Sequence, residues 1–395
     1  MAIIMLPTSD ILCLSLLRAI LILHTTFSKA VSSLSQIRFA MQYLTFSAVA
    51  SFLTIVSLAT STVTPQDQKA NLPLPSHLVH QFPAGTYVEN IRARQDGQLL
   101  VTFVAPSPNV YLIDPLVSSI APTSNMTATL VHTFPSAGLL GITEVQPDQF
   151  YVAAGNFSVA TLDLGAGTWS IWSLDLRAYN PILNSGAVVQ EAASLPKAGF
   201  LNGIDTFSVS ENLIVAADSV NGQIWLVNVE TGESKVLVSD ALLAPPAGSA
   251  ELGINGLKVL KRGDTAYLYF STQATALFGR IPVCISGNYS VGAVEILQNG
   301  TTMDDFVLDE ETGVAYMSGA GNTLLSIPLD GGQLTTVLGG LNETVLAGPT
   351  SVTLGRGLLD RHSAYVTTNG GLLAPINGTF TEGGKVVSVD ISGHC

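Results

Sequence analysis

The chain has 395 residues, a formal net charge of −13, 47% hydrophobic residues and only 11% charged ones. This composition excludes an intrinsically disordered chain and a long coiled coil, because both need many charged side chains. The acidic balance, with no basic tail or run, argues against nucleic acid as a partner and against a stable membrane partner held by anionic lipid. We expect a globular monomer.

The N-terminal region reads as a secretory leader. The apolar stretch Tyr43–Ala59 begins two residues after Met41 and ends in Ser57-Leu58-Ala59, which suits a signal-peptide cleavage site. A single membrane anchor is the alternative, although about 17 residues is the short limit for a spanning helix. We therefore predict a protein of the secretory pathway or a secreted protein, with an upstream extension at 1–40, a signal peptide at 41–60 and a linker at 61–76.

Two further features favour an oxidising, glycosylating compartment. Removal of the leader leaves two cysteines, Cys284 and Cys395, which we predict to form one disulfide, with two unpaired thiols as the alternative. The sequence also carries six Asn-x-Ser/Thr sequons near turn-like segments, which predict glycosylation at Asn125, Asn156, Asn288, Asn299, Asn342 and Asn377.

An internal repeat organises residues 77–395. The segment Leu78–Pro83 (LVHQFP) recurs as Leu130–Pro135 (LVHTFP), and each copy is followed by a glycine, an apolar residue and a strand-like run. The same order continues more loosely down the chain and gives six units of about fifty residues, a period typical of propellers. The units begin at Glu89, Leu140, Asn202, Asn255, Asp304 and Thr350.

Each unit has room for four short strands joined by turns such as Asp96-Gly97 and Glu311-Thr312-Gly313. The fold class is therefore predicted to be all-β: a six-bladed β-propeller with four antiparallel strands per blade. Because Leu130–Phe134 would be the outer strand of the first blade, its twin Leu78–Phe82 should be the outer strand of the sixth, beside Lys385–Ile391. The ring would thus be closed by an N-terminal strand, with Cys395 near the seam.

The first residue of each unit precedes the innermost strand, so the six side chains should converge at one mouth of the central channel. They include two carboxylates and two carboxamides, which are oxygen ligands that Ca²⁺ accepts. We therefore predict a metal site, with Ca²⁺ as the candidate cofactor, at Glu89, Asn202, Asn255 and Asp304. The alternative is that polar residues begin strands because they cap turns.

These motifs resemble the six-bladed propellers of the gluconolactonase, senescence-marker-protein and luciferin-regenerating-enzyme-like family over roughly residues 72–392. The resemblance rests on Glu89, Asn202, Asn255-Gly256-Leu257 and Asp304–Asp309. It implies that the family's metal ligands correspond to Glu89, Asn255 and Asp304, with Asn202 nearby. The sequence departs from the family pattern at Met303, at Asp305 and after Glu89.

The opening His80–Pro83 and Val88–Ile91 is also similar to that of secreted fungal hetero-Diels–Alderases from tropolonic sesquiterpenoid pathways. This resemblance implies a secondary-metabolite enzyme that joins a tropolone quinone methide to a humulene-type terpene, so its partners would be small apolar or aromatic metabolites.

Two enzymatic functions therefore stand side by side, and a non-catalytic binding propeller is a third possibility. A pericyclase needs a dry pocket with hydrogen-bond donors, for which we single out Asn202, Thr350 and Phe306, with Asp205 as a group behind them. A Ca²⁺-dependent lactonase or esterase would use the predicted metal site to polarise a carbonyl. The same residues serve both functions.

Overall fold

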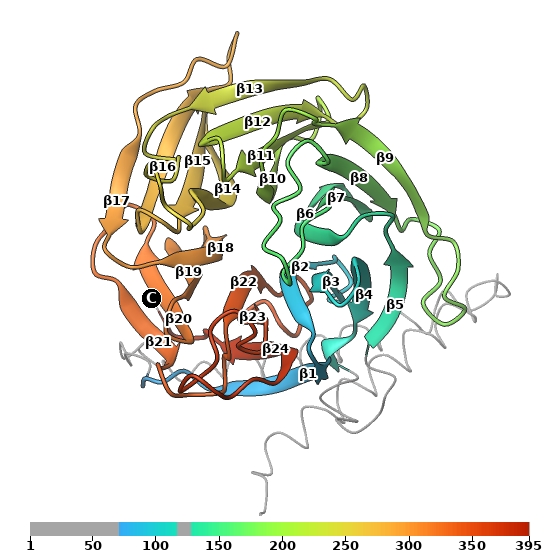
Figure 1. The fold of residues 1–395 in the computed structure, drawn as a ribbon, viewed down its shortest axis with the longest axis vertical. Helices are drawn as coiled ribbons and strands as arrows, with labels where there is room; N and C mark the ends of the chain where they lie inside the picture. Colours follow the sequence, from blue (N-terminus) through green and yellow to red (C-terminus); the bar gives the residue numbers. More distant parts are fainter. Residues whose placement is uncertain (1–70, 117–127, 395) are drawn as a thin grey trace, which may run out of the picture. The chain divides into compact units, whose positions relative to one another are not determined.

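The computed structural model describes residues 71–116 and 128–394. The predicted upstream extension, the signal peptide, the sequon at Asn125 and the predicted disulfide partner Cys395 lie outside these residues, and so does most of the predicted linker. Within the described residues there are 24 β-strands in six four-stranded sheets, and only Pro115 and Leu116 are helical, which confirms the predicted all-β propeller (Figure 1).

Blades 1 to 3 follow the chain from the ring's innermost strand outward, and all neighbouring strands are antiparallel. Blade 1 contains β2 (Tyr87–Ala93), β3 (Leu99–Ala105), β4 (Asn109–Ile113) and β5 (Ala128–Thr133). Blade 2 contains β6 (Gly138–Gln146), β7 (Gln149–Gly155), β8 (Ser170–Asp175) and β9 (Val188–Ser194). Blade 3 contains β10 (Leu201–Ser208), β11 (Leu213–Asp218), β12 (Gln223–Asn228) and β13 (Ser234–Ser239).

Blades 4 to 6 repeat this arrangement. Blade 4 contains β14 (Ile254–Arg262), β15 (Thr265–Thr272), β16 (Leu277–Cys284) and β17 (Glu295–Asn299). Blade 5 contains β18 (Met303–Asp309), β19 (Val314–Gly319), β20 (Thr323–Pro328) and β21 (Thr335–Gly339). Blade 6 contains β22 (Pro349–Leu354), β23 (Ser363–Thr368), β24 (Gly383–Asp390) and, from the other end of the described chain, β1 (Ser76–Ala84).

The ring closes as the repeated LVH-FP segment predicts. Strand β1 pairs with β24, with Leu78 opposite Val387 and His80 opposite Val386, so the outer strand of blade 6 comes from the N-terminal side. The twin segment forms β5, the outer strand of blade 1. The packed region also begins before the predicted boundary at residue 77, because Leu74 is buried and its amide donates to the Val337 carbonyl oxygen of blade 5.

Apolar side chains from neighbouring blades form the core. Leu100 and Val110 of blade 1 share a buried cluster with Ile142 and Val152 of blade 2, and similar clusters join the other blades.

The two faces of the ring are distinguished by the direction of the innermost strands. All six of these strands begin at the upper face and end at the lower face: β2, β6, β10, β14, β18 and β22. No helix in residues 71–116 and 128–394 is long and apolar enough to cross a bilayer.

Glycines set how closely the innermost strands approach one another. A β-carbon on Gly203 would lie 2.6 Å from the Asn255 carbonyl oxygen and 2.7 Å from the Leu257 amide nitrogen, so only glycine fits there. Gly141 has the same relation to Asn202 and Ile204. The narrow inner wall of blades 2 to 4 therefore depends on these residues.

Replacing Gly203 by Ala is expected to lower the free energy of unfolding by about 1–3 kcal/mol, because backbone atoms of the neighbouring strand must move. The matched control is Gly340→Ala, since a β-carbon there meets nothing closer than a flexible Glu343 side chain at 3.5 Å. Denaturant unfolding of both variants checks the prediction, and equal stability of the two would contradict it.

Candidate active site

All six innermost strands carry a bulge at the same place. In blades 2 to 6 the register with the second strand shifts across two residues, for example between Ile254 and Leu257 in β14 and between Met303 and Phe306 in β18. In β2 the shift surrounds Glu89. A bulge leaves residues unpaired and turns their side chains out of the normal alternation, which is why bulges often border active sites.

The predicted first positions are the first bulge residues, so the sequence alignment of the six units is confirmed in space. Five of them, at Glu89, Leu140, Asn202, Asn255 and Thr350, are at most 4% exposed, and Asp304 is partly buried. Buried oxygens without a partner occur at two of these positions, Glu89 Oε2 and Asn255 Oδ1. Such atoms normally find a hydrogen-bond or ion partner, so they mark this layer as a place where a ligand can bind.

A second polar layer lies at the next bulge residue and is centred on Asp305. Its carboxylate accepts hydrogen bonds from Asn90 Nδ2 at 2.9 Å and Ser351 Oγ at 3.1 Å, and forms an ion pair with Lys258 Nζ at 2.5 Å. These partners belong to blades 1, 6 and 4, so a single buried carboxylate of blade 5 ties four blades together. On the other side of the channel this layer consists of the glycines Gly141 and Gly203.

Burial dominates the electrostatics of the first layer. It raises the pKa of Glu89 to about 8, with a further contribution from the negative charge of Asp305 and an opposing one from a hydrogen bond with Tyr87. Burial, together with the charges of Glu89 and Asp305, also raises the pKa of Asp304 well above its usual range, against a hydrogen bond with Asn255. Glu89 therefore holds its proton near neutral pH unless a cation replaces that proton.

The stability of the fold should consequently fall as the pH rises. The folded state binds a proton at Glu89 more tightly than the unfolded chain does. The contribution of this protonation to the free energy of unfolding is therefore complete at acidic pH and is lost as the pH rises through about 8. Denaturant unfolding between about pH 5 and pH 9 measures it. Glu89→Gln should flatten the profile, and a stability that rises over this range would contradict the assignment.

Apolar side chains lie above the polar layers. Tyr87 and Leu140 at the top of the innermost strands belong to one buried cluster with Phe157, and Leu164 and Leu372 from upper-face loops pack against it. At the upper end of the innermost strands, apolar side chains thus lie above the polar layers. Within the described residues no three His, Cys, Asp or Glu side chains form a metal-binding group, so a cation here would also need amide oxygens.

Three residues predicted to be catalytic have side chains that contact other protein groups. The Thr350 hydroxyl donates to the Val88 carbonyl oxygen at 2.8 Å, and this hydrogen bond links blade 6 to blade 1. The same hydroxyl also hydrogen-bonds to Thr367 within blade 6. Phe306 is fully buried between blades 4 and 5, where it packs edge-to-face on Phe278, and does not line the mouth. Asp205 lies deeper in the channel, where it accepts from Thr143 and from the Val259 amide and lies 3.7 Å from Arg92.

Sequence reasoning missed the side chains that surround the first layer. Tyr87 comes two residues before Glu89 and shares a hydrogen bond with it, and Asn369 reaches Tyr87 from the β23–β24 loop. Lys258 and Asp305 follow the aligned positions by three residues and one residue. The repeat alignment contained the signal for Asp305, since Asn90 and Ser351 are polar at the same position of their units.

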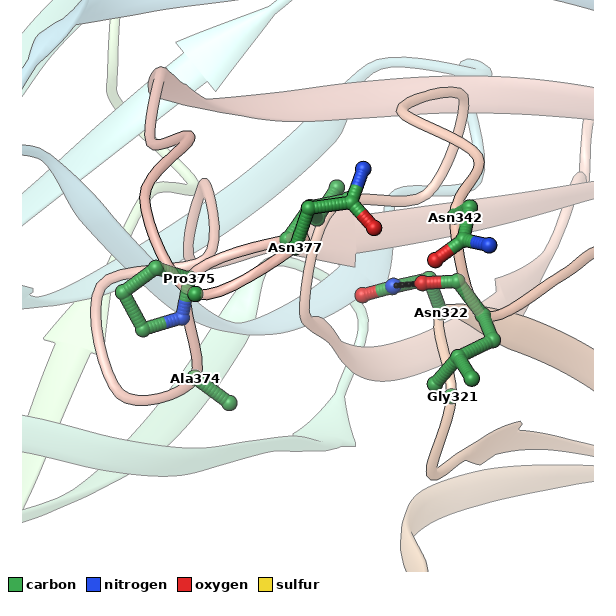
Figure 2. A pocket seen from close by; sticks show the side chains of 9 residues that line it. Gly321, Asn322, Asn342, Ala374, Pro375 and Asn377 are labelled. Carbon is green, nitrogen blue, oxygen red and sulfur yellow. Dashed lines mark hydrogen bonds between the residues drawn. The ribbon is translucent and has the colours of Figure 1, made fainter.

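The predicted glycosylation and disulfide residues lie away from the channel. The five described sequon asparagines, Asn156, Asn288, Asn299, Asn342 and Asn377, are all exposed. Two of them, Asn342 and Asn377, border a groove of about 380 Å³ between blades 5 and 6 (Figure 2), beside Asn322, whose amide donates to the Leu341 carbonyl oxygen. Cys284 ends β16 and is partly exposed, and its pairing with Cys395 stays a prediction.

Two curated proteins are similar to this chain over most of its length. One, from a Phoma species, is 28% identical over 335 residues, which is 77% of this chain and 90% of that relative. The other, from Sarocladium schorii, is 24% identical over 332 residues, or 76% of this chain and 80% of that relative. Both carry names that assign them, provisionally, as hetero-Diels–Alderases. These names support a pericyclase-type role, and no model of a protein family matches the chain.

Solved structures support the fold. A Bacteroides thetaiotaomicron protein of unknown function superimposes with a TM-score of 0.52 and 13% identity, over 82% of this chain and 73% of that one. At this identity the likeness concerns the fold alone.

Proposed function

We propose that the chain is a secondary-metabolite enzyme of the secretory pathway that catalyses a hetero-Diels–Alder cycloaddition between a tropolone quinone methide and a humulene-type terpene. The observation that carries the proposal is the similarity, over three quarters of the chain, to two proteins provisionally named hetero-Diels–Alderases. The site supports it, because an apolar cluster above buried hydrogen-bonding groups suits two apolar reactants of which one carries a reactive carbonyl.

The reaction makes modest chemical demands on the protein. One carbon–carbon and one carbon–oxygen bond form while the π-electrons of diene and alkene rearrange, and no proton or electron is transferred to the protein. The barrier falls when the two reactants are held close together and aligned. It falls further when donors stabilise the negative charge that develops on the heterodiene oxygen in the transition state.

The first layer can supply those donors. Asn202 and Asn255 carry amide groups, and Glu89 below its raised pKa carries a carboxyl proton. The apolar cluster around Tyr87, Leu140 and Phe157 would hold the terpene and exclude water, which also protects a quinone methide from hydration. Asp205 and Thr350 would act by positioning the channel wall, since their side chains are engaged with protein groups.

Comparative metabolite profiling by mass spectrometry tests the proposal, with the gene deleted and then restored. We expect a product with the summed mass of two pathway intermediates to disappear on deletion, and a water adduct of the reactive partner to accumulate. Restoration of the gene should reverse both changes. Accumulation of a lactone at the expense of its hydroxy acid would overturn the proposal in favour of a hydrolase.

A Ca²⁺-dependent lactonase or esterase is the second candidate, and the unpartnered oxygens Glu89 Oε2 and Asn255 Oδ1 favour it. With Asn202 and Asp304, these residues fit a hard cation, which accepts carboxylate and amide oxygens. Bound Ca²⁺ would act as a Lewis acid on a substrate carbonyl. The chain's own residues would hold the ion and keep the site dry.

If the site binds Ca²⁺, the ion should raise the thermal midpoint by several degrees at concentrations well above its dissociation constant. Glu89→Gln should abolish this shift, whereas Glu343→Gln, a substitution at an exposed carboxylate away from the channel, should leave it intact. Differential scanning fluorimetry with Ca²⁺ and with a chelator measures the effect. A shift that survives in Glu89→Gln would rule out this site.

A further inference from the structure

The groove between blades 5 and 6 on the upper face has room for a small ligand (Figure 2). Its volume of about 380 Å³ falls within the range of about 300–1,000 Å³ that is usual for ligand pockets. One wall consists of the β19–β20 turn and the β21–β22 loop, and the other wall is the β23–β24 loop. All the residues that line the groove are uncharged: Gly321, Asn322, Leu341, Asn342, Ala374, Pro375, Ile376, Asn377 and Gly378. The lining therefore suits an uncharged ligand.

Hydrogen bonds fix the β21–β22 loop on both sides of Asn342. The Asn322 side-chain amide of blade 5 donates to the Leu341 carbonyl oxygen at 2.9 Å. On the other side, Lys385 Nζ of blade 6 donates to the Thr344 carbonyl oxygen at 2.6 Å. The wall that carries Asn342 is thus held to both blades.

The opposite wall is a short hairpin with Asn377 near its tip. The Phe380 amide donates to the Ile376 carbonyl oxygen at 2.9 Å, and Asn377 has a φ of +52°. Asn342 and Asn377 are both exposed, and each begins an Asn-x-Thr sequon. Figure 2 shows their side chains on opposite sides of the groove, extending toward the space between them. A glycan on either asparagine would therefore start at the rim of the groove.

We propose that the groove is the seat of the chain's own N-glycan, whose first N-acetylglucosamine residues are attached to Asn342 and lie against Leu341, Ala374 and Pro375. This inference rests on the proposed passage through the secretory pathway. The linkage forms when an oligosaccharide is transferred from a lipid diphosphate to Asn342 Nδ2. The bond between sugar C1 and the diphosphate oxygen breaks, the C1–N bond forms, and the amide proton leaves with the lipid diphosphate.

The sugar and the groove have matching chemistry. A pyranose ring presents C–H groups on its faces and hydroxyl or acetamido groups at its edge, so it packs on apolar side chains while its polar groups meet amides. Leu341 is 72% exposed, and a sugar placed over it removes this apolar surface from water. We assign the glycan to Asn342 because the loop is fixed on both sides of this residue, whereas Asn377 lies near a hairpin tip.

The test is release of the glycans from the native full-length chain, secreted from a yeast host, by peptide N-glycosidase F. This enzyme cleaves the bond to the asparagine amide and needs access to it, and glycopeptide mass spectrometry follows each sequon separately. The control site is Asn299, an exposed sequon at the end of β17. We expect release from Asn342 to be about tenfold slower than release from Asn299 in the native chain. After denaturation the two rates should be equal.

A pair of substitutions tests the contact with the groove. Leu341→Ser removes an apolar side chain of the wall and should bring release from Asn342 close to the rate at Asn299. Leu373→Ser is the matched control, because Leu373 is also an exposed aliphatic residue, at 53%, but does not line the groove. Release from Asn342 should stay slow in this control.

Equal release from Asn342 and Asn299 in the native chain would overturn the proposal, and so would slow release from Asn377 in place of Asn342. The proposal also fails if light scattering shows a dimer and release from Asn342 becomes fast on dilution to the monomer. A chain glycosylated at other sequons but not at Asn342 overturns this inference and supports the secretory pathway. A chain without a glycan at any sequon overturns both.

Discussion

Removing the carboxyl group of Glu89 by substitution with Ala is expected to slow the proposed cycloaddition by about 100-fold, as the loss of a buried transition-state donor does in other enzymes. The structural reason is the position of Glu89 in the bulge of β2, where it is 4% exposed, beside Tyr87 and with Oε2 lacking a partner. The measurement is the rate of adduct formation by the purified enzyme with both reactants supplied.

The conservative variant Glu89→Gln separates two roles of this residue. Glutamine keeps a hydrogen-bond donor at the same position but cannot carry a negative charge. If Glu89 acts as a neutral donor, the Gln variant should stay within about tenfold of the unmodified rate, because one donor replaces another. A Gln variant as slow as the Ala variant would contradict the donor role and point to a charged carboxylate, as a cation site requires.

The largest effect on stability is expected at Asp305. Substitution by Ala removes the partner of the buried Lys258 ammonium and two further hydrogen bonds, from Asn90 and Ser351. Breaking a buried ion pair on one side leaves an uncompensated charge, so the free energy of unfolding should fall by about 3–5 kcal/mol. Denaturant unfolding at neutral pH measures the loss.

A second substitution tests this cause. Adding Lys258→Met to Asp305→Ala removes the unpaired charge and should recover about 1–2 kcal/mol. Asp330→Ala is the control, because this exposed carboxylate also forms an ion pair, with Arg280 at 2.7 Å, yet surface pairs contribute only about 0–1 kcal/mol. If Asp305→Ala and Asp330→Ala lose the same stability, the network around Asp305 does not hold the blades together.

The architecture could be predicted from the sequence because a propeller repeats one structural unit, the four-stranded blade, six times. The duplicated LVH-FP segment located the outer strands of blades 6 and 1, and β1 pairs with β24 as expected. Turns such as Asp96-Gly97 also behave as predicted, since Gly97 has a φ of +89°. Alternation, turn chemistry and period are local properties, and the chain displays them directly.

The arrangement of the site was accessible only in part. The aligned positions do form one layer, because repeat position determines depth along the channel. The direction of a side chain and its hydrogen-bond partners do not follow from its position in the repeat. Phe306 points into the core between blades, and the Thr350 hydroxyl donates to the Val88 carbonyl oxygen. Which of several polar residues in a bulge faces the channel depends on backbone register, which a single strand does not reveal.

The sequence by itself determined the fold class, the number of blades, the manner of closure and the set of positions from which a central site could be built. Only the tertiary structure decided that Asp305 is held by Asn90, Lys258 and Ser351, and that the carboxyl groups of Glu89 and Asp304 both have raised pKa values. The physical reason is distance along the chain. Strand periodicity and turns arise between neighbours in sequence, whereas desolvation and charge coupling arise between residues from different blades.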